Sequence, residues 1–367
     1  MANKTLFQTL IGKVLPQANT INAAGGVAYR MSAQHALAQY AATGCLNGTF
    51  YASGEEQLEQ VLRLCESVSP EFIAQTALYA RSKGHMKDMP ALLLAVLSVK
   101  SPGLLAEVFE RVIDSPKLLR NFVQIMRSGV VGRKSLGSAP KWLIRQWLES
   151  RSDEQLFTGS VGNSPSLADI VKMVHPKPTT PSRQALFGYL IGREHDQTAL
   201  PSLVRQYERI KRQIIRGSEP VPDVPFQMLT SLPLTERDWR QIARNASWQT
   251  TRMNLNTFQR HQVFADPEMV GVVANRLRNP RLIEQARVFP YQLMVAYMNA
   301  SSEVPVEIRE ALQDAMEIAI SNVPHIQGKV YVFPDVSGSM HSPVTGVRAD
   351  ATSKVRCIDV AALVAAA

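Results

Sequence analysis

Apolar residues recur every three or four positions over most of the chain, from residue 30 to about residue 320. Two clear examples are Leu58, Val61, Leu62 and Cys65, and further along Trp142, Leu143, Trp147 and Leu148. This spacing places the apolar side chains on one face of an α-helix. Such segments are separated by short polar turns, so the pattern predicts amphipathic helices that bury one face against neighbouring helices.

Six of the expected helices begin with the same pair of residues, a polar capping residue followed by proline. The capping oxygen accepts a hydrogen bond from a free backbone N–H of the first turn, and proline lacks an N–H that would have no partner there. The six pairs are Ser69-Pro70, Ser101-Pro102, Ser115-Pro116, Thr180-Pro181, Asp266-Pro267 and Asn279-Pro280. Capping boxes at Ser53/Glu56 and Thr235/Asp238 predict two further helix starts.

The succession of helices predicts a mainly α fold. A stack of antiparallel helix pairs of the HEAT or armadillo kind fits the helix lengths and the short turns. No strict repeat period is present, so a compact irregular all-α domain stays open as an alternative. Thr158 to Ser166 and Gly217 to Pro225 are rich in loop-forming residues and predict surface loops.

The pattern changes at Gly328. Lys329 to Phe333 is a β-branched and aromatic run typical of a buried strand, and Ser353 to Ala367 is typical of a helix. We expect residues 1–327 to form the helical-repeat domain and residues 328–367 to form the start of an α/β domain. One strand and one helix do not bury each other's apolar faces. We therefore expect this second domain to be incomplete and its last helix to expose an apolar face.

The composition is that of a foldable chain, with 45% hydrophobic and 19% charged residues and a formal net charge of +9. These values exclude disordered, collagenous and coiled-coil chains. The charge is uneven, because residues 127–281 carry 23 basic and 13 acidic side chains, a net charge of +10. A basic face of this kind favours nucleic acid as a partner. Arg-rich helix surfaces that are merely solvated would give the same count.

The longest apolar run, Ala91 to Val99, is too short to cross a bilayer, and no signal-peptide pattern opens the chain. We expect a cytoplasmic protein with no membrane partner. The three cysteines, Cys45, Cys65 and Cys357, form neither a disulfide nor a zinc pattern. They are expected to be small buried residues.

The strongest chemical motif is Asp335-x-Ser337-x-Ser339, directly after the expected strand. One carboxylate and two hydroxyls at alternate positions are hard oxygen ligands that suit a divalent metal ion such as Mg²⁺. A turn closed by an Asx interaction is the alternative. A phosphoaspartate transferase needs a second carboxylate at position 337, and a hydrolase elbow needs Gly-x-Ser-x-Gly. Neither is present, and no nucleophile with a base accompanies the motif, so we expect a protein that is not an enzyme.

Three groups of basic residues are candidate RNA contacts. The first lies in and after the glycine-serine loop 129–138, and comprises Arg133, Lys134, Lys141 and Arg145. The second lies in a stretch with no acidic residue from 170 to 193, and comprises Lys172, His175, Lys177 and Arg183. The third is a helix stripe that comprises Arg205, Arg209, Arg212 and Arg216. For each group a solvated helix face, or a structural histidine, is the alternative.

A further set of cations is interleaved with aromatic residues. The cations are Arg244, Arg252, Arg260 and His261, and the aromatics are Trp239, Trp248 and Phe258. Aromatic residues at helical spacing usually belong to a core, and we expect these to be buried.

The expected strand with Asp335 to Met340 resembles the first metal-ion-dependent adhesion-site motif of a von Willebrand factor A domain. Because a helical array precedes it, the chain resembles the TROVE-domain Ro ribonucleoproteins of bacterial type. Further elements occur in the order of that family, namely Gly48-Thr49-Phe50-Tyr51, Gly132-Arg133 with Trp142, His175-Pro176-Lys177-Pro178, Leu232-Pro233-Leu234-Thr235 and Arg287-Val288-Phe289-Pro290-Tyr291.

The resemblance implies a ring of HEAT-like repeats closed by the A domain. It implies binding of small structured Y RNAs on a basic outer face and of single-stranded 3′ ends of misfolded RNAs in a central hole, which is a role in noncoding-RNA quality control. An exoribonuclease is a candidate partner, and we expect a monomer.

The resemblance also implies that Asp335, Ser337 and Ser339 are metal ligands. The family adds a threonine and an aspartate from later loops that this sequence lacks, as in a chain truncated within its A domain, so we expect weak or no metal binding. A metal-dependent protein-interaction scaffold and a hydrolase that uses Asp335 remain alternatives.

Overall fold

The computed structural model describes residues 18–22, 25–44, 46, 48, 50, 52–162, 164–212, 220–323, 327–344, 346 and 353–366. Over these ranges the regular structure is almost entirely helical, which confirms the predicted mainly α class. The sheet of the described chain is one short antiparallel pair, β1 (Thr20–Ile21) and β2 (Val27–Ala28). None of the described helices is both long and apolar enough to cross a membrane.

The chain divides into two compact units, the first ending at Trp147 and the second beginning at Leu148. The predicted division between residues 327 and 328 stays a prediction. Helices of the first unit are α2 (Ala33–Thr43), α3 (Gly54–Glu66), α4 (Pro70–Ser82), α5 (Asp88–Lys100), α6 (Pro102–Val112), α7 (Pro116–Ser128) and most of α8 (Ser138–Ser150).

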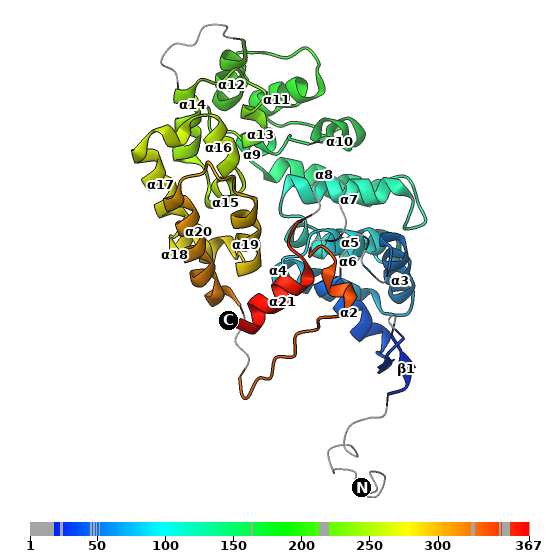
Figure 1. Ribbon diagram of the computed structural model, residues 1–367. Helices are drawn as coiled ribbons and strands as arrows, with labels where there is room; N and C mark the ends of the chain where they lie inside the picture. The colour runs from blue at the N-terminus through cyan, green and yellow to red at the C-terminus, as the bar shows by residue number, and fades with distance from the viewer. Residues whose placement is uncertain are drawn as a thin grey trace, which may run out of the picture. The chain divides into compact units, whose positions relative to one another are not determined.

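Helix α5 is the centre of the first unit. Its residues from Met89 to Ser98 are all buried, and it packs against α4, α6 and α7 (Figure 1). A helix that is apolar on every side is stable only when neighbours cover all of it. The run from Ala91 to Val99, the longest apolar stretch of the sequence, is therefore the core helix of this unit.

The second unit continues the succession of short helices (Figure 1). They are α9 (Asp153–Thr158), α10 (Leu167–Val174), α11 (Pro181–Ile191), α12 (Ser202–Arg212), α13 (Phe226–Leu229), α14 (Glu236–Asn245), α15 (Trp248–Met253), α16 (Leu255–Arg260), η1 (Val263–Ala265), α17 (Pro267–Leu277), α18 (Pro280–Ala286), α19 (Pro290–Asn299), α20 (Val306–Ala319), η2 (Ile320–Asn322), η3 (Gly338–His341) and α21 (Cys357–Ala366). Helix α20 packs against α17, α18 and α19. The expected loop after Thr158 is present, since α10 begins only at Leu167.

All six helices predicted from a cap followed by proline begin at that proline. In five of them the capping side chain accepts a backbone N–H, as Thr180 does from Arg183 at 3.1 Å. Ser101 is the exception, with no side-chain cap bond. Its backbone also ends α5, with φ −155° and ψ 84°, which differs from the extended conformation of most of the other caps. Both capping boxes, at Ser53/Glu56 and Thr235/Asp238, are confirmed.

The buried strand expected at Lys329 to Phe333 is wrong for the described structure. The segment has no strand conformation, and Val330 and Phe333 are 51% and 87% exposed. A strand needs a neighbouring strand to satisfy its backbone N–H and C=O groups, and no described segment pairs with this one. The apolar β-branched pattern is present without the partner that would bury it.

The last helix behaves as expected, because α21 has no buried residue. It begins at Cys357 rather than near Ser353, since Arg356 forms an isolated β-bridge with Pro343 just before it. Of the cysteines, Cys65 is buried and Cys357 is half-buried, whereas Cys45 lies outside the described residues.

Candidate nucleic-acid interface

Helix α12 carries the most regular group of exposed cations. Val204, Tyr207 and Ile210 are spaced by three residues and are buried, which fixes the inward face of the helix. The opposite face presents Arg205, Arg209, Lys211 and Arg212 to solvent. The predicted stripe is therefore on the surface as far as Arg212, and Arg216 lies outside the described residues.

Glu208 holds part of this stripe in place. Its carboxylate accepts a hydrogen bond from the Tyr189 hydroxyl at 2.6 Å and lies 3.6 Å from Lys211 and 3.4 Å from Arg212. Burial, together with this hydrogen bond, raises the pKa of Tyr189, so the phenol stays a donor. The side chains of Lys211 and Arg212 are 55% and 68% exposed, whereas that of Glu208 is 16% exposed. Both cations therefore remain accessible to a phosphate.

The second cluster lies at the end of α10. Lys172, His175 and Lys177 are all exposed. His175 ends the helix in the left-handed region, with φ 49°, and its backbone N–H donates to the carbonyl of Val171 at 3.0 Å. A non-glycine residue in this conformation is uncommon, and here it turns the chain sharply into the Pro176–Pro178 segment. Three of the four predicted cluster members are accessible to a ligand.

Arg183 is not accessible, and its assignment as an RNA contact needs correction. It is 8% exposed, and its guanidinium donates to Asp153, to the carbonyl of Leu148 at 2.7 Å and to that of Arg151 at 2.6 Å. These carbonyls belong to the end of α8, where the last turn has no intrahelical N–H partners. The side chain therefore joins α11 to the end of α8, and each of its three guanidinium nitrogens donates inside the protein.

Arg133 has a similar structural role in the first unit. Its guanidinium donates to the carbonyls of Ser98, Ser135 and Leu136. Ser98 lies in the last turn of α5, so the side chain fastens the glycine-serine loop to that helix. Lys134 is exposed, whereas Lys141 and Arg145 are half-buried. Whether this first group contacts RNA stays a prediction.

The aromatic set is buried as expected. Trp239, Trp248 and Phe258 are at most 5% exposed. The His261 ring stacks on Trp239 with 4.0 Å between centroids, and burial together with the nearby Arg260 charge lowers the pKa of His261. Both effects disfavour the charged imidazolium relative to the neutral ring.

Sequence reasoning missed one arginine that acts as Arg183 does. Arg276 donates to the carbonyls of Ala243 and Arg244 at the end of α14, at 2.6 and 2.5 Å. The excess of basic residues between 127 and 281 is thus partly structural, because several arginines complete the ends of neighbouring helices. No sequence signal separates these arginines from those of α12.

The Asp335 loop brings its three predicted oxygens together. The Ser337 hydroxyl donates to the Asp335 carboxylate at 3.0 Å and lies 3.0 Å from the Ser339 hydroxyl. The Ser337 N–H also donates to Asp335 at 2.8 Å, which is the Asx interaction expected of the alternative. No group of three or more His, Cys, Asp or Glu side chains able to hold a metal occurs among the described residues. The possible metal donors of this loop are three hard oxygen groups, of which only the Asp335 carboxylate is charged.

Two of the matches to known proteins describe what this chain resembles. The chain is 23% identical over 355 residues to a protein of Deinococcus radiodurans named RNA-binding protein RO60, an alignment that covers 87% of this chain. The crystal structure of the Deinococcus radiodurans RO (RSR) protein superposes on 80% of this chain with a TM-score of 0.60 at 16% identity. This chain is therefore similar to Ro proteins in sequence and in fold. No protein-family model matches it.

The chain spans 65% of the length of each of these two Deinococcus proteins. At 16% identity the structural match shows a shared helical fold and nothing finer. Elements of the Ro resemblance occupy the ends and starts of helices: His175 ends α10, Thr235 caps α14 and Pro290 begins α19. Thr49 and Tyr51 lie outside the described residues.

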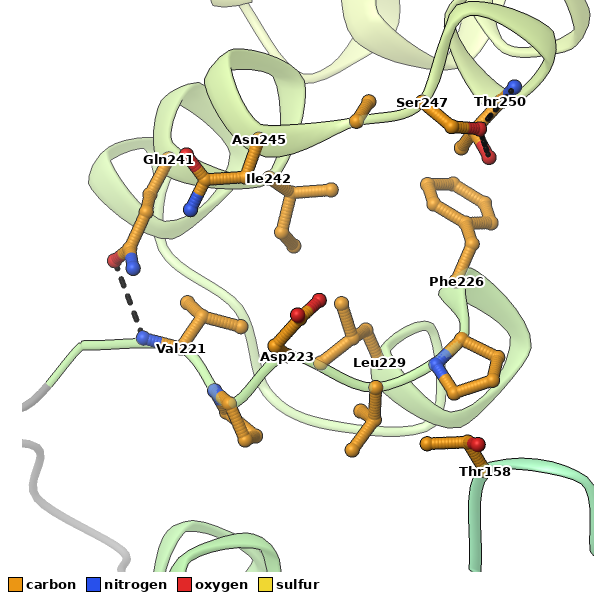
Figure 2. Close-up of a pocket in the computed structure, with 14 residues that line it drawn as sticks. Thr158, Val221, Asp223, Phe226, Leu229, Gln241, Ile242, Asn245, Ser247 and Thr250 are labelled. Carbon is orange, nitrogen blue, oxygen red and sulfur yellow. Dashed lines mark hydrogen bonds between the residues drawn. The ribbon is translucent and has the colours of Figure 1, made fainter. Parts of the chain in front are cut away.

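A pocket of about 400 Å³ in the second unit was not predicted from the sequence. It is formed by residues 221–226 with α14 and the turn before α15 (Figure 2). Figure 2 shows Asp223, Leu229 and Ile242 extending into the opening, and Gln241 fastened at its edge by the Val221 N–H at 3.1 Å. The lining residues are spread between positions 158 and 250, so only the fold brings them together.

Proposed function

We propose that this chain binds RNA. The single observation that carries the proposal is the exposed basic face of α12 in a chain whose relative is named an RNA-binding protein. Arginines spaced by three and four residues on one helix face follow a phosphate backbone, and guanidinium groups also stack on bases. The exposed residues at the end of α10 add cations in the same unit.

Helix packing connects the cations at the end of α10 with the basic face of α12. Helix α10 packs on α11, and α9 contacts both α11 and α12. The cations of α10 and α12 therefore belong to one helical assembly within the second unit. A nucleic acid that contacts both gains several phosphate contacts, each releasing counterions.

The finer part of the proposal follows the Ro resemblance. Small structured Y-like RNAs bind the basic face, and single-stranded 3′ ends of misfolded RNAs enter a central opening of the helical array. The chain acts by binding, without turnover, as a cytoplasmic monomer that hands RNA to an exoribonuclease.

A salt-series titration tests the proposal with two RNAs, a hairpin carrying a single-stranded 3′ tail and the same hairpin with a blunt end. Tail-dependent binding that weakens steeply with salt supports both the coarse and the finer proposal. Steep salt dependence without tail preference supports the basic face alone. Weak binding that stays flat from low to physiological salt contradicts RNA binding.

We also propose that Asp335, Ser337 and Ser339 hold a divalent cation such as Mg²⁺, which supports the alternative of a metal-dependent interaction scaffold. Their mutual hydrogen bonds show that the three oxygens converge. With one charged donor, the expected affinity is weak. Calorimetric titration with Mg²⁺, repeated with Asp335→Ala, tests the site. A protein pull-down that resists ribonuclease and is lost on chelation favours the scaffold over RNA binding.

A further inference from the structure

The pocket between residues 221–226 and α14 has a flat apolar wall. Phe226 lines it, and the ring is held from behind by Trp239 at 5.8 Å and Phe258 at 6.4 Å between centroids. Leu229 and Ile242 are buried beside it. A planar ligand packs well against a fixed aromatic ring. The volume of about 400 Å³ lies in the range of small-molecule sites.

Asp223 is the unusual polar group of this pocket. It is exposed, and its carboxylate has no hydrogen-bond or ion-pair partner among the described residues. The other acids described between residues 205 and 245 are engaged: Glu208 and Glu236 in ion pairs, and Asp238 in the α14 capping box. The Asp223 carboxylate is therefore available to accept hydrogen bonds from a ligand that enters the pocket.

The remaining polar groups define what that ligand must offer. A carboxylate only accepts, whereas the amides of Gln241 and Asn245 can also donate. Gln241 uses its oxygen to accept the Val221 N–H, which leaves its NH₂ group for a ligand acceptor. The pocket therefore suits a planar ring with two neighbouring donors and an acceptor beside them.

Among the RNA bases this pattern belongs to guanine, whose N1–H and N2–H are adjacent donors with the O6 acceptor next to them. Adenine and cytosine offer one amino group beside an acceptor nitrogen, which faces the carboxylate unfavourably. Uracil offers one N–H between two carbonyl oxygens. Two parallel hydrogen bonds to a charged acceptor are stronger than one and fix the orientation of the ring.

The pocket is joined to the basic helix. Gln206 of α12 donates to the carbonyl of Pro220 at 3.4 Å, and the Tyr207 hydroxyl donates to the carbonyl of Met228 at 3.3 Å. These two bonds tie both ends of the pocket segment to the helix that carries Arg205 and Arg209. When a base of an RNA strand occupies the pocket, the neighbouring phosphates of that strand lie close to the elements that include α12.

We propose that this pocket binds a guanine base of single-stranded RNA. Asp223 accepts from N1–H and N2–H, the amide of Gln241 or Asn245 donates to O6, and Phe226 packs against the ring. This inference rests on the proposed RNA binding for the strand, but the pocket also takes guanosine monophosphate as a free ligand.

The test uses the full chain and labelled RNA pentamers, UUGUU against UUAUU, UUCUU and UUUUU, in anisotropy titrations at one salt concentration. The expected preference for UUGUU is roughly 5- to 150-fold, the range of a bidentate base contact. Asp223→Asn presents one acceptor and one donor, so it should lose the guanine preference and bind xanthosine monophosphate better than guanosine monophosphate. Glu303→Gln removes one charge from an exposed residue of the same unit outside the pocket and should keep the preference.

Each outcome is decisive. Equal binding of all four pentamers overturns the guanine pocket and leaves RNA binding intact. A guanine preference that Asp223→Asn retains places the base elsewhere and also overturns the pocket. If no pentamer binds, titration with free guanosine monophosphate decides the pocket, and the hairpin titration decides RNA binding separately: guanosine monophosphate binding that is lost in Asp223→Asn supports the pocket, and no binding overturns it. A switch to xanthosine also shows that the variant is folded.

Discussion

Arg183 donates a hydrogen bond to the main-chain carbonyl of Leu148 at 2.7 Å. Leu148 lies in the last turn of α8, where carbonyl groups have no intrahelical donors. The same guanidinium contacts Asp153 at the start of α9. Arg183, which lies on α11, therefore holds the end of α8 and the start of α9 together. Its charge stabilises the interior of the fold and is not presented on the surface.

Arg183→Ala should lower the free energy of unfolding by about 3–5 kcal/mol, because it leaves a half-buried carboxylate and two carbonyls without their donor. Urea unfolding followed by circular dichroism measures the change. Arg205→Ala, an exposed arginine of α12, is the control and should stay within about 0.5 kcal/mol of the parent protein. Equal effects of the two substitutions would show that Arg183 is not the interior residue described.

The caps of α4 and α6 make a matched pair. Ser69 accepts the Phe72 N–H at 3.3 Å, whereas Ser101 has no side-chain cap bond although proline follows both. Ser69→Ala should cost about 1 kcal/mol of stability, and Ser101→Ala clearly less. Thermal or urea unfolding of both variants checks the order, and a larger loss for Ser101→Ala would contradict the cap geometry.

Alkaline pH should destabilise the fold through Cys65. Burial raises the pKa of this thiol from 9.0 to about 12. Between these values the unfolded chain loses the thiol proton and the folded chain keeps it, so the stabilisation is complete below pH 9 and is lost as the pH rises toward 12. In that window wild-type stability should fall faster than that of Cys65→Ala, by up to about 1.4 kcal/mol per pH unit.

Parallel unfolding curves for the two proteins from pH 8 to pH 11 test this prediction. The Ala variant starts from a lower stability because it leaves a cavity, so the quantity to compare is the slope with pH. Identical slopes would mean that the thiol titrates normally and is accessible to solvent.

Helix positions could be predicted from the sequence because their signals are local. The Thr180-Pro181 pair specifies its helix start with a side-chain oxygen and a fixed φ, and neither depends on the rest of the fold. The strand at Lys329 to Phe333 could not be predicted in this way. Its apolar pattern describes a segment that would be buried beside a partner, and pairing depends on residues distant in sequence.

The residues of the candidate site show the same contrast between local sequence signals and tertiary packing. Arg183 and Arg205 have the same side chain in the same basic segment, yet one completes the end of α8 and the other faces solvent. Only tertiary packing separates them. The pocket around Asp223 could not be predicted from the sequence either. Asp223 and Asn245 come together only because the 221–226 segment packs on α14.

The most direct test of RNA binding by α12 is the dependence of the binding constant on salt concentration. We compare wild type with a variant carrying Arg205→Gln, Arg209→Gln and Arg212→Gln, using the tailed hairpin. A control carries Lys100→Gln, Arg111→Gln and Lys117→Gln, three exposed cations of the first unit with the same charge change.

Each phosphate contact contributes roughly 0.7 to 0.9 to the slope of log K against log salt. The α12 variant should therefore bind more weakly at low salt and lose about 2 to 3 units of slope, while the control keeps a slope close to that of wild type. If the α12 variant and the control show the same slope as wild type, the basic face of α12 does not contact RNA, and the central proposal is wrong.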